Sequence, residues 1–284
     1  MTRRWSIPLA TAAVAVCTLL GLTGNASAAV AHHSSATDVR PGGVTTPAFR
    51  PGGLMQRPTG AAAHAAGHAR SFQAESTNWS GYAATGANGA FSSVSGSWTE
   101  PTATCSSGRR GRGGSDQYAA FWVGLDGYNS DSVEQTGTDS DCDGSSPDYY
   151  GWYEMYPADP VYFTNTVRPG DAISASVTFS GTETYTLVLR DSTQGWTQTI
   201  TKNQTGLDRS SAEVITEAPS SNSGVLPLAD FGTVNYGSST ANGTSLGSES
   251  PTEIIMIDNS GADKDSTSSI NGSGGFSNTW LRAN

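Results

Sequence analysis

Carboxyl and amide side chains gather in three short segments of the sequence. The first runs from Phe121 to Gly127 and through a loop into Val133–Gly137, the second is Gly151–Pro157, and the third is Ala212–Glu217. In a β-strand, side chains at positions i and i+2 lie on the same face. On this rule, the residues predicted to share a face are Val133 with Gln135, Trp152 with Glu154, and Glu213 with Ile215 and Glu217.

A glutamate and a glutamine together can hydrolyse a peptide bond. The carboxylate takes a proton from the attacking water and returns it to the leaving amine. The neutral amide donates an N–H to the oxygen that becomes negative. Neither step needs histidine, and the four histidines, His32, His33, His64 and His68, all precede residue 71. Residues 71–284 therefore cannot carry a Ser-His-Asp triad, a Cys-His pair or an HExxH zinc site, so we predict no metal and no cofactor.

Each of these residues also has an ordinary structural interpretation. A glutamine in a strand is usually solvated or bonded to a neighbouring backbone. Glu154 lies among aromatic residues, which would raise its pKa by desolvation, yet aromatic strands are more often core than cleft. Glu213 and Glu217 could be polar positions beside a buried Ile215.

Short strands with turn-rich connections dominate the chain after residue 70. Gly, Ser, Asn, Asp and Pro clusters separate them, and no window after residue 30 has a helical stripe. This pattern predicts one all-β domain, an antiparallel sandwich or barrel, over residues 71–284. The clearest strand patterns cover residues 91–98, 172–179, 185–189, 196–200, 212–217, 253–257 and 276–281.

The first 70 residues differ from the rest. Arg3 and Arg4, an apolar run from Ile7 to Leu22 and Ala26-Ser27-Ala28 form the pattern of a secretory signal peptide over residues 1–28. No later apolar stretch is long enough to span a membrane. We therefore expect a secreted, extracellular product without a membrane partner.

Residues 29–70 are rich in Ala, Gly and Pro and predict a flexible segment. Two interpretations remain open, a disordered linker and a basic pro-segment that covers an acidic domain until it is removed. The first 70 residues hold six of the 15 basic residues and one of the 25 acidic ones, which leaves 9 basic against 24 acidic in residues 71–284. A domain this acidic disfavours nucleic acid and anionic membranes. Acid would weaken any attraction between the two parts.

Two cysteines remain after the predicted signal peptide, Cys105 and Cys142. In an exported protein one disulfide is the default expectation. The segment Ser106–Ser115 contains three arginines among glycines and serines. One short Arg-Gly run within an acidic domain is weak evidence for RNA binding, so we predict a solvated loop.

Six motifs in order make the chain from about residue 76 to 284 resemble the glutamic peptidases, the eqolisin family. These are Asn78-Trp79-Ser80-Gly81 for N-W-x-G, Trp98-x-x-Pro101, Trp122–Gly127 for W-x-G-I-D-G, Gln135-Thr136-Gly137 for Q-T-G, Trp152–Pro157 for W-Y-E-W-Y-P, and Ala212–Glu217 for A-E-x-I-x-E. Met155 and Thr216 depart from the family pattern, and the loop Arg109–Arg112 looks inserted, which affects subsite preference more than chemistry.

The resemblance implies a fold, an activity and a set of site residues. The fold would be a sandwich of two antiparallel sheets with an active-site cleft on one curved face. Gln135 and Glu217 match the catalytic pair, and Asp126, Trp152 and Glu154 match residues that line the cleft. The chain would be a monomeric acid endopeptidase acting on proteins or peptides.

Two other functions remain open. A retaining glycosidase would use Glu154 and Glu217 as its carboxylate pair, about 5 Å apart, and would not need Gln135. A lectin-like binding module would use Trp152, Tyr153 and Tyr156 as an aromatic platform without chemistry. Sandwich folds host all three functions.

Overall fold

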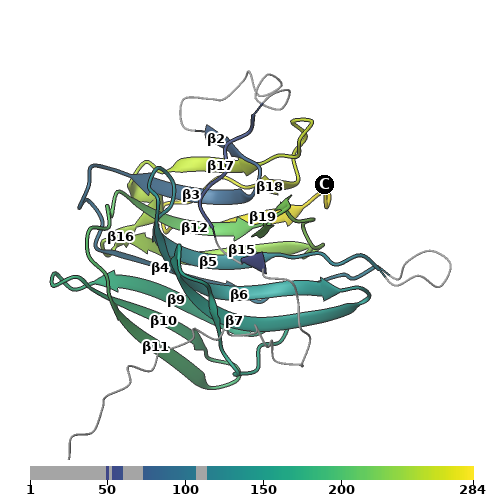
Figure 1. Ribbon diagram of the computed structural model, residues 1–284, viewed down its shortest axis with the longest axis horizontal. Helices are drawn as coiled ribbons and strands as arrows, with labels where there is room; N and C mark the ends of the chain where they lie inside the picture. The colour runs from purple at the N-terminus through teal and green to yellow at the C-terminus, as the bar shows by residue number, and fades with distance from the viewer. Residues whose placement is uncertain (1–48, 51–52, 60–72, 107–113) are drawn as a thin grey trace, which may run out of the picture. The chain divides into compact units, whose positions relative to one another are not determined.

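The computed structural model describes residues 49–50, 53–59, 73–106 and 114–284. These residues lie within one compact unit and form the nearly all-β architecture of Figure 1. The predicted signal peptide, most of the predicted linker or pro-segment and most of the Arg-Gly loop lie outside the described residues. Within the described part, no helix is long and apolar enough to cross a membrane.

Two eight-stranded sheets make up the sandwich. The first sheet has the order β11-β10-β9-β4-β15-β19-β18, with β16 paired to β15. Its strands are β11 (Trp196–Asn203), β10 (Thr184–Asp191), β9 (Ala172–Phe179), β4 (Ser93–Thr99), β15 (Thr233–Ala241), β19 (Phe276–Trp280), β18 (Asp265–Thr267) and β16 (Thr244–Ser245).

The second sheet has the order β2-β17-β3-β12-β5-β6-β7-β8 and is antiparallel except for the β2–β17 pair. Its strands are β2 (Gln73–Ser76), β17 (Thr252–Met256), β3 (Trp79–Thr85), β12 (Ser211–Glu217), β5 (Ala120–Asp126), β6 (Val133–Asp143), β7 (Ser146–Tyr156) and β8 (Val161–Tyr162). Three two-residue strands, β1 (Phe49–Arg50), β13 (Ser220–Ser221) and β14 (Gly224–Val225), form a small third sheet, and η2 (Leu246–Ser248) is a short 3-10 turn.

The predicted sandwich of two antiparallel sheets is confirmed. Strand β9 shows why the prediction succeeded: Ile173, Ala175 and Val177 are buried, while the residues between them are more exposed. Strands β9 and β10 pair as an antiparallel hairpin. The predicted strand patterns omit β3, β15, which is rich in Gly, Ser and Thr, and the polar second half of β6.

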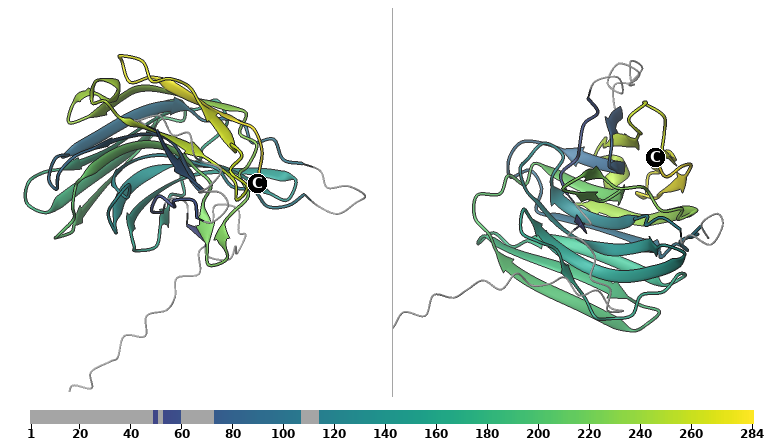
Figure 2. Two further views of the ribbon diagram at one scale, coloured as in Figure 1. Left: turned by 90° about the horizontal axis from the view of Figure 1, so that it is seen from above. Right: turned by 45° about the vertical axis from the view of Figure 1, so that its right-hand side comes forward.

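Two hydrophobic clusters lie on opposite faces of the second sheet. The larger one fills the space between the sheets, with Val123 and Val214 facing Val177 and Leu187 of the first sheet. The smaller one draws on strands of the second sheet, including Trp79, Trp122 and Trp152, so it lies on the face turned away from the first sheet. We call this the outer face. Figure 2 shows both sheets bent in the same sense.

The predicted disulfide is confirmed. Cys105 and Cys142 are joined by an S–S bond of 2.02 Å and close a sequence separation of 37 residues. The bond links the loop after β4 to the end of β6. It therefore holds one end of the strand that carries Gln135.

Several carboxyl groups are buried in the sandwich. Burial raises the pKa of Glu134 to about 9, assisted by the nearby charge of Asp126. Burial also raises the pKa of Glu100 to about 8, although Thr138, Ser140 and Trp98 donate to it. Each group keeps its proton in the folded state at pH values where the unfolded chain has lost it, so folding stability falls as pH rises above the unfolded pKa of about 4.3.

We therefore predict that the thermal unfolding temperature falls as pH rises from about 5 to about 8. Glu134→Gln, which removes one of these protons, should reduce the slope of unfolding free energy against pH by up to about 1.4 kcal/mol per pH unit. Thermal unfolding followed by circular dichroism at several pH values measures both slopes. Glu249→Gln, at an exposed glutamate, is the control. Equal slopes in wild type and Glu134→Gln would contradict the prediction.

Candidate active site

The predicted site residues Gln135, Trp152, Glu154 and Glu217 all lie on the outer face of the second sheet. Strand alternation and the two clusters fix this assignment, because Ile215, Trp122 and Trp152 belong to the outer-face cluster while Val214, Val123 and Tyr153 belong to the core between the sheets. The sequence prediction of shared faces within each strand therefore extends across four neighbouring strands.

The pairing register arranges this face in three rows across strands β12, β5, β6 and β7. The rows are Glu213–Gly124–Gln135–Glu154, Ile215–Trp122–Gly137–Trp152, and Glu217–Ala120–Asp139–Tyr150. Gln135 and Glu217 are thus two strands and two rows apart, about 10 Å across and about 13 Å along the strands between Cα positions. Their side chains face the same side, with Trp122 in the row between them.

The Glu217 carboxyl group is held by two nitrogen donors. The indole Nε1 of Trp122 donates to Oε2 at 2.9 Å, and Nδ2 of Asn78 donates to Oε1 at 3.2 Å. Glu217 is fully buried, and this burial raises its pKa well above the ordinary value even though these donors favour the ionised form. In this covered arrangement burial therefore favours the protonated form of Glu217.

Gln135 is oriented by Glu154. Its Nε2 donates to Oε2 of Glu154 at 2.8 Å, across the β6–β7 pair in which the two residues stand opposite each other. A side-chain amide has two N–H bonds, so one remains for another acceptor. Gly124, between Gln135 and Glu213 in the same row, has no room for a side chain, because a Cβ there would be 2.9 Å from the Trp122 ring.

Trp152 is anchored through Asp139. Its Nε1 donates to Oδ1 of Asp139 at 2.6 Å, and the Tyr150 hydroxyl donates to Oδ2 at 3.0 Å. Asp139 also shares its row with Glu217, with only the small side chain of Ala120 between them. The aromatic floor beside Glu217 is therefore fixed by a buried carboxylate.

Asp126 is placed differently from the other predicted residues. It ends β5 with a positive φ of 71°, and its carboxylate accepts the backbone N–H groups of Arg209 at 2.6 Å and Ser210 at 2.8 Å. It thereby joins the end of β5 to the start of β12, next to Glu134 and Glu213. Its contact with substrate stays a prediction, and the geometry gives it a positioning role.

Glu213 does not act on Glu217. It lies four residues away on the same strand, about 13 Å along it, and its own pKa is raised well above the ordinary value by burial and then by Asp126 and Glu134. Glu213 is therefore too far from Glu217 to oppose its ionisation, and it is not among the groups that shift the Glu217 pKa.

Three residues of the site received no role from the sequence: Asn78, Trp122 and Asp139. Asn78 occurs in an N-x-S context, but it is fully buried and binds Glu217, so it is no site for a glycan in the folded chain. Asp139 could have been found from strand periodicity, because it lies four residues after Gln135 on the same face. Within the described residues, no group of three or more His, Cys, Asp or Glu side chains could hold a metal ion.

Comparisons with known proteins identify relatives of this chain. A model of the peptidase A4 family matches residues 77–280. The chain is similar to scytalido-glutamic peptidase, solved with a transition state analog inhibitor, at 28% identity and a TM-score of 0.60, covering 72% of this chain and 98% of that one. It is also similar to SCP-B, an eqolisin peptidase in complex with the tripeptide Ala-Ile-His, at 26% identity and a TM-score of 0.57, with the same coverage.

Aspergilloglutamic peptidase from Aspergillus niger is similar at 25% identity and a TM-score of 0.51, covering 58% of this chain and 99% of that one. A search among curated proteins found no match. The solved neighbours are therefore matched over nearly their whole length by a part of this chain.

The Trp122 indole generates a prediction about pH. Trp122→Phe removes a donor that favours the ionised form of Glu217, so the pKa of this carboxyl group should rise. If ionised Glu217 is needed, peptide hydrolysis should be lost first at the lowest pH, and the acid limb of the pH–rate profile should move to higher pH. Trp196→Phe, in the first sheet, is the control. An acid limb that stays in place in Trp122→Phe would contradict this account of the indole.

Proposed function

Since this chain belongs to the peptidase A4 family and is a glutamic endopeptidase, we propose that Glu217 and Gln135 carry its chemistry. Glu217 acts first as general base and then as general acid, and Gln135 donates to the tetrahedral oxyanion. The observation that carries the proposal is the pair of donors on Glu217. Two hydrogen bonds to a carboxylate favour its ionised form, which a base needs in acid once the site is open to water.

The proposed reaction uses the two side chains in turn. Glu217 takes a proton from a water molecule as the water oxygen attacks the scissile carbonyl carbon. The carbonyl oxygen becomes negative and accepts the remaining N–H of Gln135. The protonated Glu217 then returns its proton to the leaving amine, the C–N bond breaks, and Glu217 is ionised again. Because Gln135 and Glu217 stand two strands and two rows apart, the proposal requires the water and the scissile carbonyl to lie between the two side chains.

The glycosidase alternative is disfavoured by the partners of the two glutamates. Glu154 accepts the Gln135 amide at 2.8 Å, whereas Glu217 accepts Asn78 and Trp122. A retaining pair needs its two carboxyl groups close together, about 5 Å apart. Glu154 instead orients Gln135, which the glycosidase would not need.

The aromatic platform of the lectin alternative is divided between two faces. Trp152 belongs to the outer-face cluster, whereas Tyr153 packs in the core between the sheets, where its ring stacks on Phe163. Adjacent strand residues point to opposite sides, so these rings cannot stack together on one sugar.

The signal-peptide pattern of residues 1–28 extends the proposal to the location of the enzyme. We infer that the peptidase is exported and acts outside the cell on protein or peptide substrates. The acidic composition of residues 71–284 supports work in acid, where the surface is less self-repelling.

The central prediction concerns the catalytic pair. Glu217→Gln removes the base and should lower kcat by about 10²-fold or more. Gln135→Ala removes the oxyanion donor and should lower kcat by about 10²–10³-fold. Both variants should unfold at nearly the wild-type temperature. A quenched peptide assay in acid measures the rates, with the exposed Glu249→Gln as control; full activity in Glu217→Gln would overturn the assignment.

Two further variants separate positioning from chemistry. Gln135→Glu should be poor at moderate pH, because a carboxylate there repels the oxyanion. Glu154→Gln should lose less activity than Gln135→Ala, because it only frees the orientation of the Gln135 amide. Their pH–rate profiles test this order, and a loss in Glu154→Gln that exceeds the loss in Gln135→Ala would favour the glycosidase.

A further inference from the structure

We propose that residues 53–57 occupy the substrate groove of this chain, block Glu217, and show which peptides the groove accepts. The inference rests on the proposed function of Glu217. The accepted peptide is an extended segment with a small residue over Glu217, followed by two aliphatic residues and a polar one. The occupant in the structure is Gly53-Leu54-Met55-Gln56-Arg57.

The segment lies directly on the Glu217 carboxyl group. A Cβ built on Gly53 would be 3.8 Å from Oε1 of Glu217, and a backbone hydrogen bond from Gly53 is among the contacts that act on the Glu217 pKa. Upstream, β1 pairs in antiparallel fashion with β13, which begins three residues after Glu217. The left view of Figure 2 shows the dark purple β1 near the green β13–β14 hairpin.

Asn78 binds the main chain of the segment on both sides of Met55. Its Nδ2 donates to the Leu54 carbonyl at 3.1 Å, and its Oδ1 accepts the Gln56 N–H at 2.8 Å. The Met55 N–H donates to the Gly127 carbonyl at 3.2 Å. Main-chain contacts of this kind hold an extended peptide whatever its sequence, and Asn78 connects them directly to Glu217.

Further contacts to the main chain come from the end of β2 and the residue after it. The Gln56 carbonyl accepts the Thr77 N–H at 2.9 Å and the Ser76 hydroxyl at 3.0 Å. The Gln56 side chain donates to the Ser220 hydroxyl at 2.7 Å. Three consecutive residues of the segment are thus bound through their backbones.

Side-chain packing determines which side chains the groove accepts. Met55 is only 9% exposed and belongs to the outer-face cluster with Trp79, Trp122 and Trp152, while Leu54 packs against the edge of that cluster. An aliphatic side chain at the Met55 position therefore fills the floor of the groove. A charged side chain there would be buried against indole rings without a partner.

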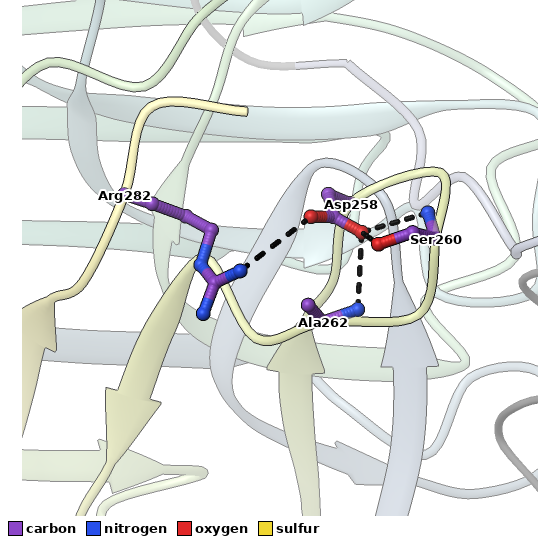
Figure 3. Close-up of polar contacts among 4 residues, drawn as sticks. All are labelled: Asp258, Ser260, Ala262 and Arg282. Carbon is purple, nitrogen blue, oxygen red and sulfur yellow. Dashed lines mark hydrogen bonds and ion pairs between the residues drawn. The ribbon is translucent and has the colours of Figure 1, made fainter.

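Charge contributes little to the described contacts. Arg57 donates to the Asn129 side chain at 2.9 Å and lies 5.1 Å from the centre of the Tyr128 ring, both uncharged groups. The cavity beside Gln56 and Arg57 does include Asp258. Figure 3 shows that this carboxylate is already bound by Ser260, Ala262 and Arg282. The segment is therefore held by its backbone and by Met55 rather than by attraction between opposite charges.

The segment is not part of the peptidase fold itself. The family match begins at residue 77, and 72% of this chain suffices to cover 98% of the scytalido-glutamic peptidase chain. Glu217, Gln135 and Trp152 are nevertheless all fully buried, so no substrate reaches them in this arrangement. The segment thus stands where a substrate must lie.

The first test compares two full-length variants that gain the same charge. Met55→Asp should release the segment and raise the initial rate on a quenched peptide by about tenfold or more over full-length wild type. Thr59→Asp adds the charge at an exposed position four residues away and should leave the initial rate unchanged. Equal initial rates in Met55→Asp, Thr59→Asp and wild type would overturn the proposal.

The second test does not depend on activity. In full-length Glu217→Gln, hydrogen–deuterium exchange should show slow exchange at the N–H groups of Met55 and Gln56, which are hydrogen-bonded. Adding Met55→Asp should make both exchange at least tenfold faster while the strand amides stay protected. Fast exchange at both positions in Glu217→Gln alone would also overturn the proposal.

The third test reads the specificity. Cleavage sites in a denatured protein mixture, mapped by mass spectrometry after incubation in acid, should be enriched in a small residue followed by two aliphatic residues. Cleavage that depends on Glu217 but shows no such enrichment would reject the specificity and keep the proposed function. Cleavage that persists in Glu217→Gln would reject the proposed function itself. The exchange test would still show whether residues 53–57 are bound in the groove.

Discussion

Both faces of the second sheet are buried, and this constraint determines how its polar residues are arranged. One face packs on the first sheet, and the other carries three tryptophans and a row of carboxyl and amide groups. Buried polar groups usually have a hydrogen-bond partner. Here Trp122 donates to Glu217, Gln135 donates to Glu154 and Trp152 donates to Asp139. The side chains proposed for catalysis are therefore held in place by the same bonds that make their burial tolerable.

The constraint also explains which elements the sequence could predict. Strands β9 and β10 alternate because one of their faces is exposed, and their patterns were recognised. Strand β6 is buried almost throughout and polar along much of its length, as in Thr138-Asp139-Ser140-Asp141, so neither alternation nor hydrophobicity marks it. Its polar residues satisfy long-range partners such as Trp98 and Glu100, which no local pattern can reveal.

The site was predicted in part for the same reason. Face sharing within a strand is local, so Trp152 with Glu154 and Glu213 with Glu217 were placed correctly on common faces. The offset of two rows between Gln135 and Glu217 depends on how both strands pair with β5. No local pattern gives this pairing, so only the family resemblance assigned the two residues to one site. Asn78 was missed because its role depends on residues 54–56, which composition marked only as basic and flexible.

Residues 53–57 and the groove belong to one chain, with residues 60–72 joining the described segment 53–59 to β2. Two groups joined by a short linker meet at an effective concentration in the millimolar range. A peptide that binds the groove only weakly from solution can therefore fill it almost completely when it is attached. Occupancy then depends on one covalent bond more than on affinity, because cutting the connection turns an intramolecular equilibrium into a bimolecular one that dilution reverses.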